Sequence, residues 1–181
     1  MINLSDYDNS NYEHGGLAKR IVWMIFSVCF FETWFPWPSS FKCMLLRIFN
    51  ASVGQSVVIK PNVKIKYPWN LKIGNYCWIG EFVWIDNLAC VDIACNVCIS
   101  QGAYILTGNH DYQSKRFTLL VKPIKIEQGC WVGAKVVLCP GVILKYGSIA
   151  TVGSVVTSNL ESMSIYQGNP AVKKKEWSIS Q

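Results

Sequence analysis

The chain has 181 residues, and 17 Lys and Arg against 11 Asp and Glu give it a net charge of +6. Because 51% of the residues are hydrophobic and only 15% are charged, a disordered chain is excluded and one domain with a sizeable core is predicted. The eight Cys amount to about half the density of a disulfide scaffold, and the polar first 16 residues carry no basic signal start. We therefore expect free thiols in a cytoplasmic protein. The basic residues are dispersed, so no nucleic-acid partner is expected.

Residues 1–50 form a first segment that is apolar and aromatic from residue 17 to residue 49. Its most hydrophobic part, residues 21–37, contains Glu32 and Pro36 and is 17 residues long. A spanning helix needs about 20 predominantly apolar residues. Basic residues on both sides would suit a helix pair in peripheral contact with a membrane surface. A helical hairpin packed on the main domain is the equally open alternative.

An aliphatic residue recurs every six positions across residues 51–160, and Val, Ile or Leu occupies fourteen of the fifteen positions. Residues four positions later are mostly small or β-branched, so two side chains per hexad would point inward. Such a period predicts an all-β solenoid, a parallel β-helix in which stacked coils bury one another. Glycines follow several of these positions directly, where a Cβ is costly. The recurring positions are Val53, Ile59, Ile65, Ile73, Ile79, Ile85, Ile93, Ile99, Ile105, Ile126, Val132, Leu138, Leu144, Ala150 and Val156, and the glycines are Gly54, Gly74, Gly80 and Gly133.

Three steps in the repeat are longer than six residues: eight after Ile65, eight after Ile85 and twenty-one after Ile105. Each follows the third hexad of a group, so three hexads per coil would place all three insertions at one corner of a triangular prism. The longest, residues 107–123, contains His110. Loops of this length are usually functional or disordered. Residues 161–181 are expected to form a C-terminal tail.

Several motifs resemble the hexapeptide-repeat acyltransferases. They are the Ile-Gly hexad starts, the TGNHDY loop, the stretch GCWVGAKVVLCPGVIL and the endings GSVVT and QGNPA. YPW at residues 67–69, WIGEFVWI at residues 78–85 and the aromatic N-terminal segment are similar to the colanic-acid biosynthesis acetyltransferases within that family. The resemblance implies a left-handed parallel β-helix that assembles as a homotrimer with active sites between subunits. It also implies an O-acetyltransferase that moves acetyl from acetyl-CoA to a sugar hydroxyl of an exopolysaccharide precursor, either a sugar nucleotide or a lipid-linked saccharide.

The resemblance makes His110 the candidate general base. A hydroxyl is a weak nucleophile near neutral pH, and an imidazole with a pKa of about 6.5 can take its proton as it attacks the thioester. Both substrates can meet in one groove, so direct attack needs no acyl-enzyme. Asp111 is not assigned as the partner of the imidazole, because neighbouring side chains in a loop often point apart. A neutral acceptor such as a backbone carbonyl could hold the tautomer instead.

The remaining site residues follow from the same resemblance. The related galactoside and maltose acetyltransferases carry Asn where this chain has Gly80, so their acceptor site is not transferred. Backbone groups at coil turns can bond the pantetheine arm, and no metal is expected. The cofactor-binding candidates are Trp131, Gly133, Ala134, Val152, Thr157 and Lys175, and the acceptor-binding candidates are Glu81, Asp86 and Tyr112.

Cysteine spacing supplies one competing hypothesis. Cys90, Cys95 and Cys98 match the C-x4-C-x2-C spacing of plant-type ferredoxins, with Cys130 as a fourth ligand. The hexad register runs through this segment and places Cys130 at an ordinary inward position, which favours structural thiols.

Other activities of solenoid proteins are also weighed. The zinc site of the γ-class carbonic anhydrases needs three His, and this chain has only His14 and His110. An acetyltransferase that acts on a small xenobiotic such as an antibiotic, and a non-catalytic solenoid scaffold, are the alternatives to the sugar O-acetyltransferase.

Overall fold

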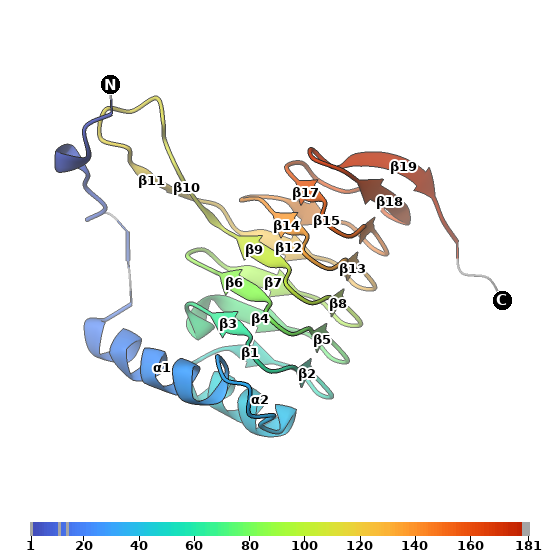
Figure 1. The fold of residues 1–181 in the computed structure, drawn as a ribbon, viewed down its shortest axis with the longest axis horizontal. Helices are drawn as coiled ribbons and strands as arrows, with labels where there is room; N and C mark the ends of the chain where they lie inside the picture. The colour runs from blue at the N-terminus through green and yellow to red at the C-terminus, as the bar shows by residue number, and fades with distance from the viewer. Residues whose placement is uncertain (1, 11, 14, 179–181) are drawn as a thin grey trace.

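The computed structural model describes residues 2–10, 12–13 and 15–178, so His14 lies outside the described residues. The chain winds through three parallel sheets in turn and forms a stack of triangular coils (Figure 1). The first sheet contains β1 (Ser52–Val53), β4 (Leu71–Ile73), β7 (Val91–Ile93), β12 (Ile124–Ile126) and β15 (Ile143–Leu144). The second contains β2 (Val58–Ile59), β5 (Trp78–Ile79), β8 (Cys98–Ile99), β13 (Trp131–Val132), β16 (Ile149–Ala150), β18 (Ser164–Gln167) and β19 (Val172–Glu176). The third contains β3 (Lys64–Ile65), β6 (Trp84–Asp86), β9 (Tyr104–Leu106), β14 (Val137–Leu138) and β17 (Val155–Val156). The predicted parallel β-helix of hexads is confirmed.

The two-residue strands contribute one inward side chain each, β4, β7 and β12 contribute two, and these side chains stack from coil to coil. In the second sheet the inward column runs through Ile59, Ile79, Ile99, Val132 and Ala150. All five are buried, whereas the residue before each one faces outward. The recurring aliphatic residue therefore forms the core, and burial of these columns stabilises the stack.

Glycine directly after an inward residue leaves room for the next coil. A Cβ on Gly74 would lie 2.6 Å from the backbone nitrogen of Cys95, and a Cβ on Gly133 would lie 2.7 Å from the carbonyl oxygen of Ala150. The left-handed conformation occurs two residues further on, for example at Tyr76, where φ is 58°. The requirement at Gly74 and Gly133 is thus space between coils and not positive φ.

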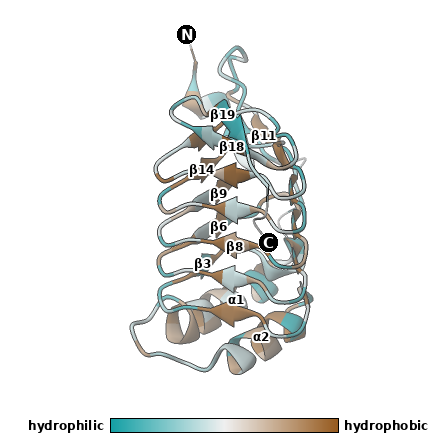
Figure 2. Cartoon of the chain, turned by 90° about the vertical axis from the view of Figure 1, so that its right-hand side faces the viewer, coloured by the Kyte–Doolittle hydropathy of each residue, from teal (hydrophilic) through white to brown (hydrophobic). Residues whose placement is uncertain are grey.

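Two helices precede the solenoid, α1 (Leu17–Phe30) and α2 (Ser39–Ile48). They lie at one end of the stack (Figure 2), where α2 packs against β1 and β2. Trp23 and Leu46 are buried in the same core as the coils. In the part of the chain that the structure describes, no helix is both long enough and apolar enough to cross a membrane.

All three insertions in the hexad repeat project from the β-helix at the corner between the third and first sheets. The 3-10 helix η2 (Pro68–Asn70) belongs to the first, and an antiparallel hairpin of β10 (Gly108–His110) and β11 (Leu119–Val121) forms the third. A further 3-10 helix, η1 (Leu4–Asp6), lies near the N-terminus. The C-terminal residues, expected as a tail, contain β18 and β19, and β19 folds back antiparallel on β18.

Candidate active site

His110 ends β10, and its imidazole is held by the other arm of the hairpin. Nδ1 lies 2.9 Å from the carbonyl oxygen of Phe117, and the two rings stack with centroids 4.3 Å apart. Phe117 has a φ of 49°, in the left-handed region that bulky residues rarely adopt. A carbonyl can only accept a hydrogen bond, so Nδ1 carries the proton. In the neutral ring Nε2 is then the unprotonated nitrogen, which can accept a proton.

Other polar groups of the hairpin have separate roles. The carboxylate of Asp111 accepts a hydrogen bond from the backbone N–H of Gln113 at 3.0 Å and closes the turn. Tyr112, an acceptor-binding candidate, is 73% exposed beside this turn. On the other side, the ring of Tyr7 lies 5.8 Å from the imidazole, and the N–H of Asn3 donates to the carbonyl of Lys115. Tyr7 could not be predicted as a neighbour of His110, because the polar N-terminal residues show no periodic signal.

Four of the six cofactor-binding candidates line one groove on the second sheet, called here the Trp131 groove. Its volume is about 390 Å³. The indole N–H of Trp131 donates to the hydroxyl of Ser100 at 2.9 Å, which orients the half-exposed ring. The lining is mostly apolar and includes the small residues Gly133, Ala134 and Ala150. The groove is formed by Ser100, Gln101, Trp131, Gly133, Ala134, Ile149, Ala150, Thr151 and Val152.

The other two cofactor-binding candidates lie outside this groove. Thr157 is exposed after β17, on the third sheet. Lys175 lies on β19. In the strand register Trp131 pairs with Ile149, Ile149 with Ile165 and Ile165 with Lys175, so these four residues form one row across the second sheet. Lys175 is therefore in the same outward row of the second sheet as Trp131, whereas Thr157 is on a different side of the prism.

The two acidic acceptor candidates have different surroundings. Glu81 is exposed and lines a groove of about 330 Å³ that shares Ser100 and Gln101 with the Trp131 groove. Asp86 is only 8% exposed, and its carboxylate forms an ion pair with Lys66 at 2.8 Å. The hydroxyl of Tyr104 also donates a hydrogen bond to Asp86. The pKa of Tyr104 is raised to about 12, mainly by burial and to a smaller extent by the negative charge of Asp86. Glu81 is thus next to the Trp131 groove, while Asp86 is already paired.

His110 and the Trp131 groove lie on different sides of the molecule. Figure 1 shows β10 and β11 projecting from one side of the stack, with β8 and β13 on the opposite side. Within one chain, the candidate base and the candidate cofactor groove are therefore not brought together.

The cysteines of the ferredoxin-like spacing are distributed over different faces. Cys98 lies on β8 of the second sheet, and Cys90 lines a groove beside the first sheet. Cys130 is buried, and burial raises the pKa of its thiol. Among the described residues, no three His, Cys, Asp or Glu side chains gather as metal ligands.

Comparison with known proteins gives relatives along nearly the whole chain, although no family model matches it. Escherichia coli K12 WcaF, provisionally named a colanic acid biosynthesis acetyltransferase, is 36% identical over 178 residues, which is 97% of each chain. Galactoside O-acetyltransferase of the same organism is 29% identical over 129 residues, 70% of this chain and 64% of the relative. Among solved structures, a hexapeptide-repeat acetyltransferase from Vibrio cholerae complexed with acetyl coenzyme A superposes with a TM-score of 0.81 at 22% identity. That match covers 90% of this chain and 88% of the other.

The structural likeness shows the fold, and the sequence likeness to WcaF extends over almost all of both chains. Together with the hexads, the hairpin with His110 and the Trp131 groove, these findings place the chain in the hexapeptide-repeat acetyltransferase family, in the group that includes WcaF.

Proposed function

We propose that this protein is an O-acetyltransferase that moves acetyl from acetyl-CoA to a sugar hydroxyl of an exopolysaccharide precursor. The observation that carries the proposal is the contact between Nδ1 of His110 and the carbonyl of Phe117, which leaves Nε2 free of a proton in the neutral ring. Membership of the acetyltransferase family supports the reaction class. The name of the galactoside acetyltransferase supports a sugar hydroxyl as acceptor.

His110 acts as general base in the proposed reaction. Nε2 takes the proton of the acceptor hydroxyl while the oxygen attacks the thioester carbonyl carbon. The C–O bond forms, the C–S bond breaks, and the imidazolium returns its proton to the departing CoA thiolate. Nδ1 keeps its hydrogen bond to the carbonyl throughout, so the ring need not reorient.

The Trp131 groove is the proposed site for acetyl-CoA. It is mostly apolar and includes small residues, so the pantetheine arm can approach the backbone at Gly133 and Ala134. Lys175 continues the same row, where a cation suits the phosphates of CoA. The complex of the Vibrio cholerae structure with acetyl coenzyme A supports a cofactor of this class.

We further propose that the active site forms between two copies in a homotrimer, because His110 and the Trp131 groove are separated within one chain. A mixing experiment tests this. His110→Ala removes the base, and Ala134→Trp fills the groove. When both chains are co-expressed, sites between an intact hairpin and an intact groove regain activity. Two inactive parents that stay inactive after mixing would show that each site lies within one chain.

The reaction is tested by chromatographic detection of CoA released from acetyl-CoA, with a panel of fucose- and galactose-containing acceptors. Removal of a general base costs about 10²- to 10⁴-fold in rate, so we expect at least a hundredfold loss in His110→Ala. Thr118→Ala, in the same hairpin, is the matched control. Release that is independent of acceptor, or equal in His110→Ala, would contradict the proposal and favour a scaffold.

A further inference from the structure

One face of α1 is apolar and exposed to solvent. Leu17, Ile21, Met24, Ile25 and Val28 are each at least 45% exposed, although they recur at the three- and four-residue spacing of one helix face. The opposite face, which carries Trp23, packs into the core. Contiguous exposed apolar surface of this kind marks a binding site more often than it occurs by chance.

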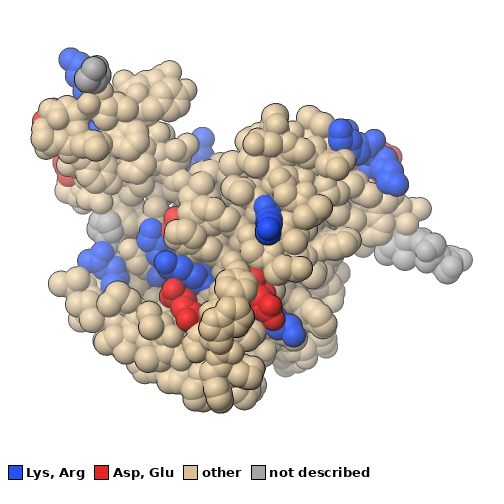
Figure 3. Space-filling model, viewed as in Figure 1, with Lys and Arg blue, Asp and Glu red and all other residues tan. Residues whose placement is uncertain are grey.

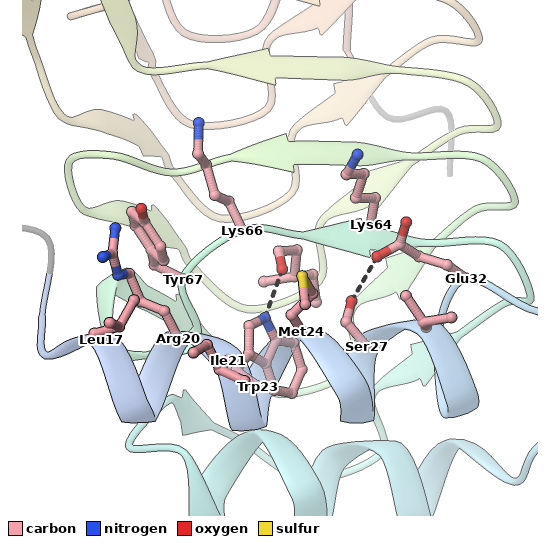
Figure 4. A pocket seen from close by; sticks show the side chains of 12 residues that line it. Leu17, Arg20, Ile21, Trp23, Met24, Ser27, Glu32, Lys64, Lys66 and Tyr67 are labelled. Carbon is pink, nitrogen blue, oxygen red and sulfur yellow. Dashed lines mark hydrogen bonds between the residues drawn. The ribbon is translucent and has the colours of Figure 1, made fainter.

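A groove of about 530 Å³ lies between α1 and the first coil of the third sheet. Ile21, Met24 and Val28 supply its apolar side. Figure 4 shows Arg20 rising from α1 beside Tyr67, with Lys64 and Lys66 projecting above the helix. In the space-filling view, Lys and Arg side chains lie in the hollow between the hairpin lobe and the α1 lobe, with acidic side chains beside them (Figure 3). The groove is therefore amphipathic, with a cationic rim beside an aliphatic face.

Two carboxylates lie near this rim, and both are already engaged. Glu32 accepts a hydrogen bond from the hydroxyl of Ser27 at 2.8 Å, at the far end of the groove. Asp86 pairs with Lys66 at 2.8 Å. Glu32 keeps its negative charge while it accepts the hydrogen bond from Ser27, so three cations face two carboxylates and the rim retains an excess of positive charge.

Arg20 supplies an independent indication of an anionic ligand. Its Nε is buried and has no hydrogen-bond partner within the described chain. A buried donor without an acceptor is unfavourable, because it has lost its hydrogen bonds to water. Guanidinium groups bind phosphate through two parallel hydrogen bonds, so a phosphate in the groove would supply the missing acceptor once the Arg20 side chain turns its Nε toward the groove. Lys64 lies over the ring of Trp84 at 4.6 Å, on the same side of the groove.

We propose that this groove binds the lipid diphosphate end of a lipid-linked saccharide. Arg20, Lys64 and Lys66 hold the diphosphate, and the first aliphatic units lie along Ile21, Met24 and Val28. A sugar nucleotide also has a diphosphate but has no aliphatic chain to cover the apolar side. The inference deepens the proposed function, because it assigns the acceptor to the lipid-linked class.

The strand register provides a path from the groove to the hairpin. Lys64, Trp84 and Tyr104 are neighbours in the outward column of the third sheet, and Tyr104 begins β9, which leads directly into β10 with His110. Trp84 and Tyr104 stack with ring centroids 4.6 Å apart. A saccharide attached to a diphosphate at the rim would extend along this column toward the proposed base.

Calorimetric titration of the full chain with farnesyl diphosphate tests the proposal without any acetyl transfer. Farnesol, inorganic pyrophosphate, UDP and phosphatidylglycerol vesicles are the matched ligands. We expect farnesyl diphosphate to bind at least tenfold more tightly than farnesol, pyrophosphate or UDP. Arg20→Gln and Met24→Ser should each weaken that binding at least fivefold, and Arg20→Lys should weaken it less than Arg20→Gln. Lys145→Gln, an exposed lysine on a distant coil, should leave it unchanged.

Each contrary result overturns the proposal in a different way. Equal binding of pyrophosphate would indicate an anion site alone, equal binding of farnesol an apolar site alone, and equal binding of UDP a nucleotide site. Vesicle binding that is stronger than farnesyl diphosphate binding and depends on Arg20 would indicate a bilayer surface. If farnesyl diphosphate fails to bind while CoA release still requires His110, the groove proposal falls and the proposed function stands. If farnesyl diphosphate binds as expected but no CoA is released with any acceptor, the groove proposal stands and the proposed acetyl transfer falls.

Discussion

Alanine in place of Gly74 tests the packing between coils that positions every candidate site residue. The new Cβ would lie 2.6 Å from the nitrogen of Cys95 and 2.7 Å from the carbonyl carbon of Ala94, both main-chain atoms of the next coil. The coils would have to separate by up to about 0.8 Å to reach ordinary contact, which would stretch the hydrogen bond from Gly74 to Ile93. Overpacking costs about 1 to 3 kcal/mol, and main chain cannot rotate away as a side chain can. We therefore expect a loss of about 3 kcal/mol.

For a chain of this length, about 3 kcal/mol corresponds to a fall in Tm of about 6 to 12 °C. Thermal unfolding followed by circular dichroism measures it. Gly153→Ala is the matched control, since φ is +69° there and a Cβ would meet nothing within 4 Å. Its cost comes from the left-handed backbone alone and is about 1 kcal/mol. If Gly74→Ala is no less stable than Gly153→Ala, close approach of the coils is not the reason for glycine at this position.

Three further predictions concern buried or exposed polar groups. Asn87→Ala should lower the free energy of unfolding by about 2 to 4 kcal/mol in urea, because buried Asn87 bonds both the N–H and the carbonyl of Tyr67, at 2.9 and 2.6 Å; an unchanged midpoint would contradict it. Burial lowers the pKa of Lys42 in the folded chain below its ordinary value of 10.5, which applies to the unfolded chain. Between the folded and unfolded pKa values the unfolded chain binds more protons, so the free energy of unfolding rises as the pH rises toward 10.5. Urea unfolding at pH 8 and pH 10 should show this rise in the free energy of unfolding in the wild type and not in Lys42→Met. The same pH dependence in both proteins would refute the prediction. Cys29 is exposed, so the fastest thiol labelling at pH 8 should vanish in Cys29→Ser and persist if another cysteine is responsible.

The repeat of six was sufficient to predict the coil, its inward columns and the single corner from which all three insertions leave. These properties depend on side-chain polarity within a few neighbouring residues, which a period reveals directly. The same register brought Trp131, Gly133, Ala134 and Val152 into one groove, since residues at equivalent positions of stacked coils are neighbours.

Contacts between segments without a period were not predictable in this way. The carbonyl of Phe117 reaches His110 only because the hairpin folds back with Phe117 at positive φ. Tyr7 contacts His110 although it lies far away in the sequence, near the N-terminus. The sequence made Asp86 an acceptor-binding candidate, whereas in the structure its carboxylate forms an ion pair with Lys66 of the neighbouring coil. No local pattern encodes these pairings.

The amino-acid sequence by itself determined the parallel β-helix, the family resemblance and His110 as the candidate base, because each depends on a repeat or a contiguous motif. Only the tertiary structure decided which nitrogen of His110 is free and that His110 and the Trp131 groove lie on different sides of one chain. It alone also placed Arg20 of α1 beside Lys64 and Lys66. The physical reason is that these relations depend on packing between distant segments, where burial and charge pairing are satisfied only once the coils are stacked.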